Sequence, residues 1–134
     1  MTKYKNEVII IEDDLDIASL LKYNLEKIGV ESLLAYDGEE GLRLIKENMP
    51  DLIILDLMLP KIDGYAVLAA IKENILLSDV PVIILSAKVT PGAILKGFHM
   101  GAIDYIPKPF NIGELVLRVS ELLEKAGKVG DYGK

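Results

Sequence analysis

Acidic, hydroxyl and ammonium side chains stand directly after three short apolar runs and after one further strand candidate in this chain. They are Glu12, Asp13 and Asp14 after residues 8–11, Asp56 after residues 52–55, Ser86 after residues 82–85, and Lys108 after residues 103–107. If these runs are parallel strands of one sheet, their carboxyl ends meet at the same edge, where such sheets bind ligands. The side chains would then form one site with three or four carboxylates, one hydroxyl and one ammonium.

Such a site fits metal-assisted phosphoryl chemistry. Clustered carboxylates repel one another unless a cation neutralises them, and an all-oxygen set suits Mg²⁺, or Mn²⁺ in its place. An ionised carboxylate is a nucleophile at neutral pH without a histidine base, and Asp56 stands alone after the run expected to be central. Lys108 and the metal would supply positive charge, and Ser86 would donate a hydrogen bond to a phosphoryl oxygen.

The elements that must position this site read as five repeats of a strand followed by a helix. The apolar runs contain no alternating polar residues, which is typical of strands buried on both faces of a parallel sheet. The expected strands are residues 8–11, 30–36, 52–55, 82–85 and 103–107. The expected helices are residues 14–28, a helix capped by Asp37 and ending before Pro50, residues 64–74, residues 91–100, and a helix capped by Asn111. This order predicts an α/β fold with a doubly wound parallel sheet.

Composition excludes several other kinds of protein. The 134 residues include no cysteine and one histidine, so disulfide scaffolds, thiolate zinc sites and multi-histidine metal sites are ruled out. Fifteen basic and 21 acidic residues give a net charge of −6, which disfavours binding to nucleic acids and anionic membranes. No apolar run could span a bilayer, and a cytoplasmic location is the default expectation. We expect one domain, residues 1–126, and a flexible tail or start of a linker, residues 127–134.

The motifs together resemble the receiver domains of bacterial two-component response regulators. They are Glu12-Asp13-Asp14, Leu55-Asp56-Leu57-Met58-Leu59-Pro60, Asp63-Gly64, Ser86-Ala87, Gly101-Ala102 and Asp104-Tyr105-Ile106-Pro107-Lys108-Pro109-Phe110. The resemblance covers the chain from about residue 7 to residue 125. It implies the flavodoxin-like fold of the chemotaxis regulator, a (βα)5 chain whose five parallel strands have the order 2-1-3-4-5.

The resemblance also implies a role for each site residue. Asp56 accepts a phosphoryl group from the phosphohistidine of a sensor histidine kinase or a histidine phosphotransfer protein. Asp13, Asp56 and the backbone carbonyl of Met58 bind Mg²⁺ directly, and Glu12 acts through water. Lys108 and Ser86 contact the phosphoryl group. By this resemblance the chain catalyses its own aspartyl phosphorylation and dephosphorylation and is not an ordinary enzyme.

The output expected from the resemblance is a two-state change. Ser86 shifts towards the phosphoryl group and Tyr105 moves from an exposed to an inward rotamer, while the Lys108–Pro109 peptide is cis. The fourth helix, fifth strand and fifth helix then present a changed face to an output domain or a target protein. Phosphorylation of such domains can also produce a homodimer. Here Ile94 and Ile103 stand where charged residues are usual, which argues against a salt-bridged dimer.

Two other functions stay open at this point. The first is a receiver-like module that binds partner proteins without being phosphorylated. The second is a metal-dependent phosphohydrolase, although Met58 stands where haloacid-dehalogenase-like enzymes need a second acid. Asp14 has two interpretations, as a member of the acidic site or as the cap of the first helix. The helical stripe Ile17, Leu20, Leu21, Leu25 and Ile28 is expected to be mainly core, with one edge available as a kinase dock.

Overall fold

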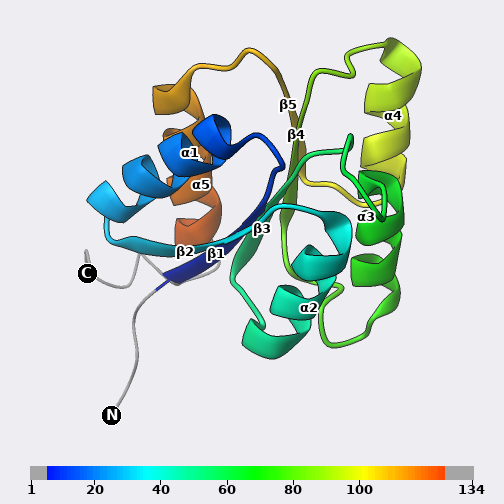
Figure 1. Ribbon diagram of the computed structural model, residues 1–134, viewed down its shortest axis with the longest axis horizontal. Helices are drawn as coiled ribbons and strands as arrows, with labels where there is room; N and C mark the ends of the chain where they lie inside the picture. The colour runs from blue at the N-terminus through cyan, green and yellow to red at the C-terminus, as the bar shows by residue number, and fades with distance from the viewer. Residues whose placement is uncertain (1–5, 126–134) are drawn as a thin grey trace.

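The computed structural model describes residues 6–125 and shows five strands alternating with five helices (Figure 1). The elements are β1 (Asn6–Ile11), α1 (Leu15–Lys27), β2 (Val30–Ala35), α2 (Gly38–Asn48), β3 (Leu52–Leu55), α3 (Gly64–Glu73), β4 (Val82–Ser86), α4 (Pro91–His99), β5 (Asp104–Pro107) and α5 (Ile112–Lys125). All neighbouring strands pair in parallel, in the order β2-β1-β3-β4-β5. The predicted flavodoxin-like topology is therefore confirmed.

The sheet separates two hydrophobic cores. Side chains alternate across a strand, so Ile9 and Ile11 of β1 pack in one core with Ile45 of α2 and the buried face of α3. Val8 and Ile10 face the other core, which contains the buried residues of α1 and α5. Figure 1 shows α1 and α5 on one side of the sheet and α2, α3 and α4 on the other. Burial on both faces explains why the central strands read as unbroken apolar runs.

Four strand boundaries differ from the sequence prediction: β2 ends and β5 begins one residue inside the expected range, whereas β1 and β4 extend beyond it. β1 begins at Asn6, two residues earlier than expected, because Asn6 and Glu7 pair with Val30 and Glu31 of β2. The Asp51 amide donates to the Glu7 carbonyl at 2.8 Å, and the Glu7 amide donates to Asp51 Oδ2 at 2.9 Å. β4 continues to Ser86, whose partner in β5 is Pro107. The added residues Asn6, Glu7 and Ser86 are polar, so a prediction from apolar runs does not include them in the strands.

Side chains cap the start of each helix beside the carboxyl edge of the sheet. Asp14 accepts hydrogen bonds from the amides of Asp16 and Ile17, which confirms its interpretation as a cap. Asp37 and Asn111 cap α2 and α5 as predicted. Asp63 and Thr90 cap α3 and α4 in the same way. These caps determine the residue at which each helix begins after the loop that follows a strand.

The expectation for the α1 stripe, mainly core with one exposed edge, is confirmed, and the use of that edge as a kinase dock stays a prediction. Leu21 and Leu25 are buried, whereas 44% of Leu20 and 46% of Ile28 are exposed. The sheet and α5 cover a narrower arc of α1 than the stripe occupies. The predicted tail, residues 127–134, lies outside the described residues, and the domain limit at residue 126 stays a prediction. None of the helices among residues 6–125 is long and apolar enough to cross a membrane.

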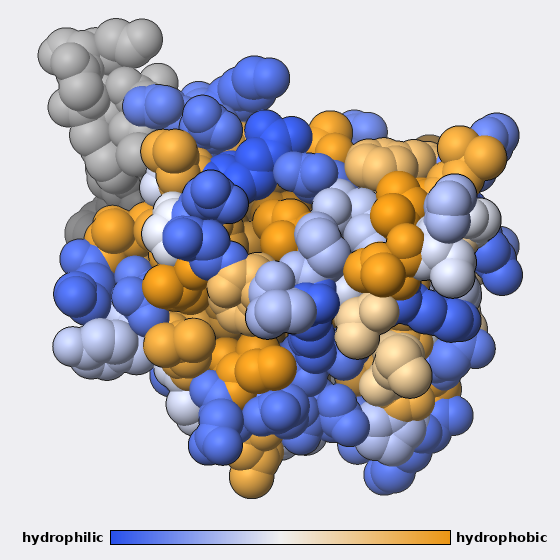
Figure 2. Space-filling view, turned by 90° about the horizontal axis from the view of Figure 1, so that it is seen from above, coloured by the Kyte–Doolittle hydropathy of each residue, from blue (hydrophilic) through white to orange (hydrophobic). Residues whose placement is uncertain are grey.

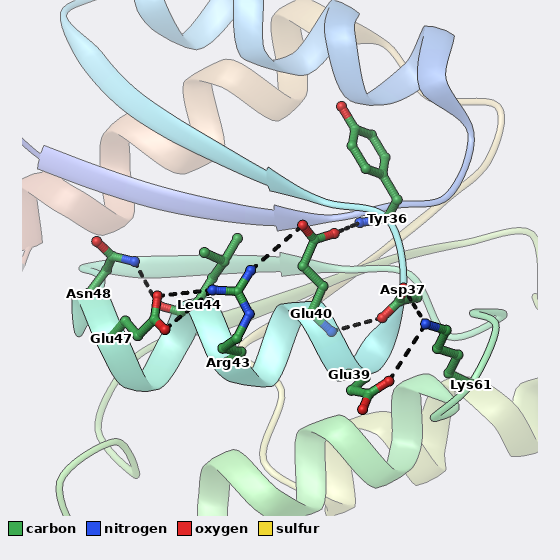
Figure 3. Close-up of polar contacts among 9 residues, drawn as sticks. All are labelled: Tyr36, Asp37, Glu39, Glu40, Arg43, Leu44, Glu47, Asn48 and Lys61. Carbon is green, nitrogen blue, oxygen red and sulfur yellow. Dashed lines mark hydrogen bonds and ion pairs between the residues drawn. The ribbon is translucent and has the colours of Figure 1, made fainter.

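The loop after β3 is joined to the start of α2 (Figure 3). Lys61 Nζ lies 3.7 Å from Asp37 Oδ2 and 3.6 Å from Glu39 Oε1, and the Gly38 amide donates to the Pro60 carbonyl at 3.3 Å. A Cβ at Gly38 would lie 2.2 Å from the Ile62 carbonyl oxygen, so this approach requires glycine. The exposed ion pairs contribute little stability, and the backbone contacts set the loop's position.

Candidate functional site

The carboxyl edge of the sheet brings three carboxylates together. Ligand atoms of Glu12, Asp13 and Asp56 lie within 4.8 Å of one another. Glu12 and Asp56 are buried and Asp13 is exposed, so the cluster opens to solvent on the side of Asp13. Because Asp14 turns away to cap α1, the site holds three acids.

Lys108 connects the two buried acids. Its Nζ lies 2.7 Å from Glu12 Oε1 and 3.2 Å from Asp56 Oδ2. The Lys108 amide donates to the Ser86 carbonyl at 2.9 Å, which aligns the end of β5 with the end of β4. The Lys108–Pro109 peptide is cis, as expected. The predicted convergence of Asp56 and Lys108 is therefore present, and the shorter contact to Glu12 was not foreseen.

Asp56 is also fixed by the loop that follows it. The Met58 amide donates to Asp56 Oδ1 at 3.1 Å, so each carboxylate oxygen has a partner. The Gly64 amide donates to the Leu57 carbonyl at 2.9 Å. A Cβ at Gly64 would lie 2.4 Å from the Asp56 carbonyl oxygen, so α3 can begin this close to the acid only with glycine there.

Ser86 lies fully buried at the end of β4. Its hydroxyl oxygen accepts a hydrogen bond from the Lys88 amide at 3.1 Å. The hydroxyl proton remains available to a neighbouring acceptor, since that bond uses only the oxygen lone pair. Ser86 therefore stands at the predicted edge with a donor for an incoming oxygen.

The charges of the site perturb one another. Burial raises the pKa of Glu12, and the nearby negative charge of Asp56 acts in the same direction, against the opposing contacts with Lys108 and the Asp14 amide. Burial alone would lower the pKa of Lys108. The hydrogen bond to Glu12 and the negative charges of Asp56 and Glu12 outweigh it, and the pKa of Lys108 is raised. The ammonium is thus kept charged between two acids.

The acidic cluster has the chemistry of a site for a hard divalent cation. Its donors are all oxygens, and Glu12 Oε1 is buried beside the Lys108 ammonium at 2.7 Å. Mg²⁺ and Mn²⁺ favour such donors. The residues present fit a metal, and the predicted ligand set of Asp13, Asp56, the Met58 carbonyl and Glu12 through water stays a prediction.

Tyr105 lies inward on β5, with 8% of its surface exposed. Its hydroxyl donates to the Lys88 carbonyl in the loop between β4 and α4. Burial raises the pKa of Tyr105, and the nearby Tyr65 and Asp56 add to the effect. Tyr105 is therefore inward in this structure, and its change of rotamer on phosphorylation stays a prediction.

The face formed by α4, β5 and α5 contains an ion pair within the chain. Arg118 Nε lies 2.8 Å from Asp104 Oδ2, so both residues are already paired with each other. Ile103 beside them is nearly half exposed. Figure 2 looks down on the molecule from above and shows separate hydrophobic groups, one of them on the α3 and α4 side, with hydrophilic side chains between.

Comparison with known proteins assigns the chain to a family. The model of the response regulator receiver domain matches residues 8–120, and this chain belongs to that family. The DNA-binding dual master transcriptional regulator RpaA of Synechocystis is 39% identical over 127 residues, covering 95% of this chain and 53% of RpaA. The transcriptional regulatory protein PrrA of Mycobacterium tuberculosis is 41% identical over 120 residues, covering 90% of this chain and 51% of PrrA. The chain thus spans about half the length of these curated relatives.

Solved structures agree with this assignment. The receiver domain of the Francisella response regulator 1452 superimposes with a TM-score of 0.85 at 36% identity, covering 91% of this chain and 99% of that domain. The chemotaxis response regulator CheY4 of Vibrio cholerae gives a TM-score of 0.83 at 25% identity, covering 89% and 99%. Two-component signalling is therefore the context of this fold and acidic pocket.

Proposed function

We propose that this chain is a phosphorylation-dependent switch whose phosphoacceptor is Asp56. The observation that carries the proposal is the placement of Asp56. It is a buried carboxylate at the end of the central strand β3, 3.2 Å from a lysine ammonium and clustered with two further acids. The phosphoryl donor is the phosphohistidine of a sensor histidine kinase or a histidine phosphotransfer protein.

In the transfer, an oxygen of the Asp56 carboxylate forms a bond to phosphorus while the bond from phosphorus to the donor's imidazole nitrogen breaks. The electron pair stays on that nitrogen, which takes up a proton from solvent. The Lys108 ammonium offsets the negative charge of the transferred group, and the Ser86 hydroxyl donates to one of its oxygens. The Met58 amide keeps the Asp56 carboxylate oriented. A bound divalent cation, Mg²⁺ or Mn²⁺, supplies positive charge to the carboxylates and the incoming phosphoryl oxygens.

The family and one of its solved members support this chemistry. A beryllium-fluoride-activated DrrB receiver domain superimposes with a TM-score of 0.81 at 32% identity, covering 90% of this chain and 98% of that domain. We infer that the same kind of phosphoryl mimic binds at Asp56 here. The chain then catalyses both its own phosphorylation and the hydrolysis of its aspartyl phosphate.

The output passes through the face of α4, β5 and α5 to an output domain or a target protein. The relatives named as transcriptional regulators are about twice as long as this chain, which supports an attached effector. Asp104 and Arg118 are paired with each other, so a phosphorylation-induced homodimer would use the exposed apolar residues of this face. We propose contacts with proteins in the cytoplasm, and none with nucleic acid or membrane, for the net acidic chain itself.

Intact-mass measurement after incubation with acetyl phosphate and Mg²⁺ tests the proposal. We expect one added phosphoryl group on the wild type and on Asp16→Asn, a control that changes an exposed acid of α1. Asp56→Asn, or chelation of the metal, should abolish the adduct. Absence of an adduct on the folded wild type, together with no binding of beryllium fluoride, would overturn the proposal in favour of a constitutive binding module.

A further inference from the structure

Two tyrosine hydroxyls hold the segment that leads from β4 into α4. Tyr105 donates to the Lys88 carbonyl from the β5 side. Tyr65, on the first turn of α3, donates to the Ala93 carbonyl on the first turn of α4 at 3.2 Å. The two tyrosines reach this segment from different elements, β5 and α3, so each supplies a restraint of its own.

Tyr65 also contacts this segment through its ring. Lys96 Nζ lies 4.1 Å from the ring centroid and Lys88 Nζ lies 5.4 Å from it. Ammonium groups at these distances are attracted to the electron-rich face of the ring. Because Ala93 and Lys96 are three residues apart on one helical face, the hydroxyl and the ring of Tyr65 contact the same side of α4.

Tyr65 is also connected, through the backbone of its neighbour, to the proposed phosphoacceptor Asp56. Its neighbour Gly64 donates to the Leu57 carbonyl at 2.9 Å and lies so close to the Asp56 backbone that no Cβ fits between them. A displacement of the loop after Asp56 therefore moves the start of α3, and Tyr65 with it. This path runs from Asp56 through α3 to α4 without involving Ser86 or Tyr105.

α4 is a helix that such contacts can control. Its buried residue is Gly97, whereas 61% of Leu95 and 43% of Phe98 are exposed. Apolar burial therefore fixes its position weakly, and each polar contact is a large part of what holds it.

We propose that Tyr65 is a second positioning residue of the switch. It couples the Asp56 loop to α4 along a path separate from the Ser86 and Tyr105 path, and it favours the α4 position in which Tyr105 lies inward. This inference rests on the proposed function, in which a phosphoryl group at Asp56 selects that position.

Beryllium fluoride with Mg²⁺ is the probe for the test, which uses the whole chain and two measurements. Amide hydrogen exchange follows residues 88–97, and titration gives the apparent Kd of the mimic. Tyr65→Phe removes only the hydroxyl. We expect exchange in α4 to be faster than in the wild type, exchange in β1 and β3 to be unchanged, and the apparent Kd to rise about two- to tenfold, the effect of losing one hydrogen bond. Tyr23→Phe, an exposed tyrosine of α1 with a lysine over its ring, is the matched control and should change neither measurement.

Two further variants distinguish a positioning role of Tyr65 from a purely structural role. Lys96→Gln leaves the hydroxyl bond in place and should raise the Kd in the same direction by less. The double variant Tyr65→Phe/Tyr105→Phe should bind the mimic more weakly than either single variant, and because both tyrosines contact Lys88 the two fold-changes need not multiply. A double variant no weaker than Tyr105→Phe alone would overturn the separate path.

The outcomes distinguish this inference from the proposed function. If the wild type binds no mimic and accepts no phosphoryl group, the proposed function fails first. If the wild type binds the mimic but Tyr65→Phe keeps the wild-type Kd, Tyr65 has no positioning role and the proposed function stands. Faster exchange throughout the sheet with an unchanged Kd would show a purely structural residue and would also overturn the inference.

Discussion

The helices α1 and α4 lie on opposite sides of the same sheet and are held in different ways. α1 has 13 residues, a cap that accepts two amide bonds, and three buried residues, Ala18, Leu21 and Leu25. α4 has nine residues and buries Gly97, with Ile94 and Met100 packed partly against the core. The hydroxyls of Tyr65 and Tyr105 and the cap residue Thr90 provide its polar restraints. A helix held by apolar burial keeps one position, whereas one held by a few polar contacts can shift at small cost.

The largest effect expected from this comparison is in the core under α1. Leu25→Ala removes a buried side chain and should lower the free energy of unfolding by about 2–5 kcal/mol, because the cavity cannot fully collapse. Leu95→Ala on the exposed face of α4 should change it by no more than about 0.5 kcal/mol. Denaturant titration at a constant m-value measures both. Equal losses for the two variants would contradict the proposed difference between the helices.

Two glycines of α4 should respond in opposite directions. A Cβ at Gly97 would lie 2.7 Å from Ile84 Cδ1 and 3.1 Å from Tyr105 Cδ2, whereas a Cβ at Gly92 meets nothing within 4 Å. Gly97→Ala should lower the free energy of unfolding by about 1–3 kcal/mol through overpacking. Gly92→Ala should raise it by up to about 1 kcal/mol through helix propensity. Thermal unfolding compares the pair, and a stabilised Gly97→Ala would show that α4 has room to move away from the sheet.

The smallest effect is a pH dependence of the Tyr105 restraint. Burial raises the pKa of Tyr105, so above about pH 10 the unfolded chain loses a proton that the folded chain keeps. The unfolded state then binds fewer protons, and stability falls as pH rises through this range. Tyr105→Phe should cost about 1 kcal/mol at pH 8, for its lost hydrogen bond, and should lose stability less steeply above pH 10.

Denaturation midpoints of both proteins between pH 8 and pH 11 measure this difference. The pKa of Lys108 is also raised, so its titration lowers the stability of the wild type and of Tyr105→Phe alike as pH rises. The difference between the two slopes of stability against pH therefore reports on Tyr105. Parallel slopes would mean that the Tyr105 phenol ionises as freely in the folded protein as in the unfolded chain.

Two kinds of feature were predictable from the sequence: strands whose side chains are buried, and site residues that directly follow a strand. Apolar runs identified β1, β3 and β4, and the polar residues at or after their ends identified Glu12, Asp13, Asp56 and Ser86, while Lys108 was found after β5. Residues 91–100 were predicted to be helical although they contain Gly92 and Gly97, and glycine disfavours helices. Gly97 is tolerated there because the helix lies close to Ile84 and Tyr105, a tertiary reason that local propensity does not contain.

Some contacts between distant elements were not predictable from the sequence. The pairing of Lys108 with Glu12 depends on how far β5 reaches across the sheet edge. The contact of Tyr65 with Ala93 depends on the spacing of α3 and α4, and the only sequence signal was an aromatic residue directly after Asp63-Gly64. An exposed edge of the α1 stripe was expected, but the sequence did not show that Leu20 and Ile28 form it, because periodicity identifies a helix face without showing how much of it is covered.

The two edges of the sheet differ in how readily they could recruit another strand. β5 has four residues and ends in Pro107, which has no amide hydrogen to donate, and it starts at an aspartate engaged by Arg118. Such an edge resists edge-to-edge aggregation. β2 has six residues and contains no proline, and Leu33 and Leu34 are only partly buried. At high protein concentration or in partly unfolded molecules, aggregation through strand pairing should therefore begin at β2. A proline or a second charged residue in β2 would be the first substitution to try for slowing aggregation during storage.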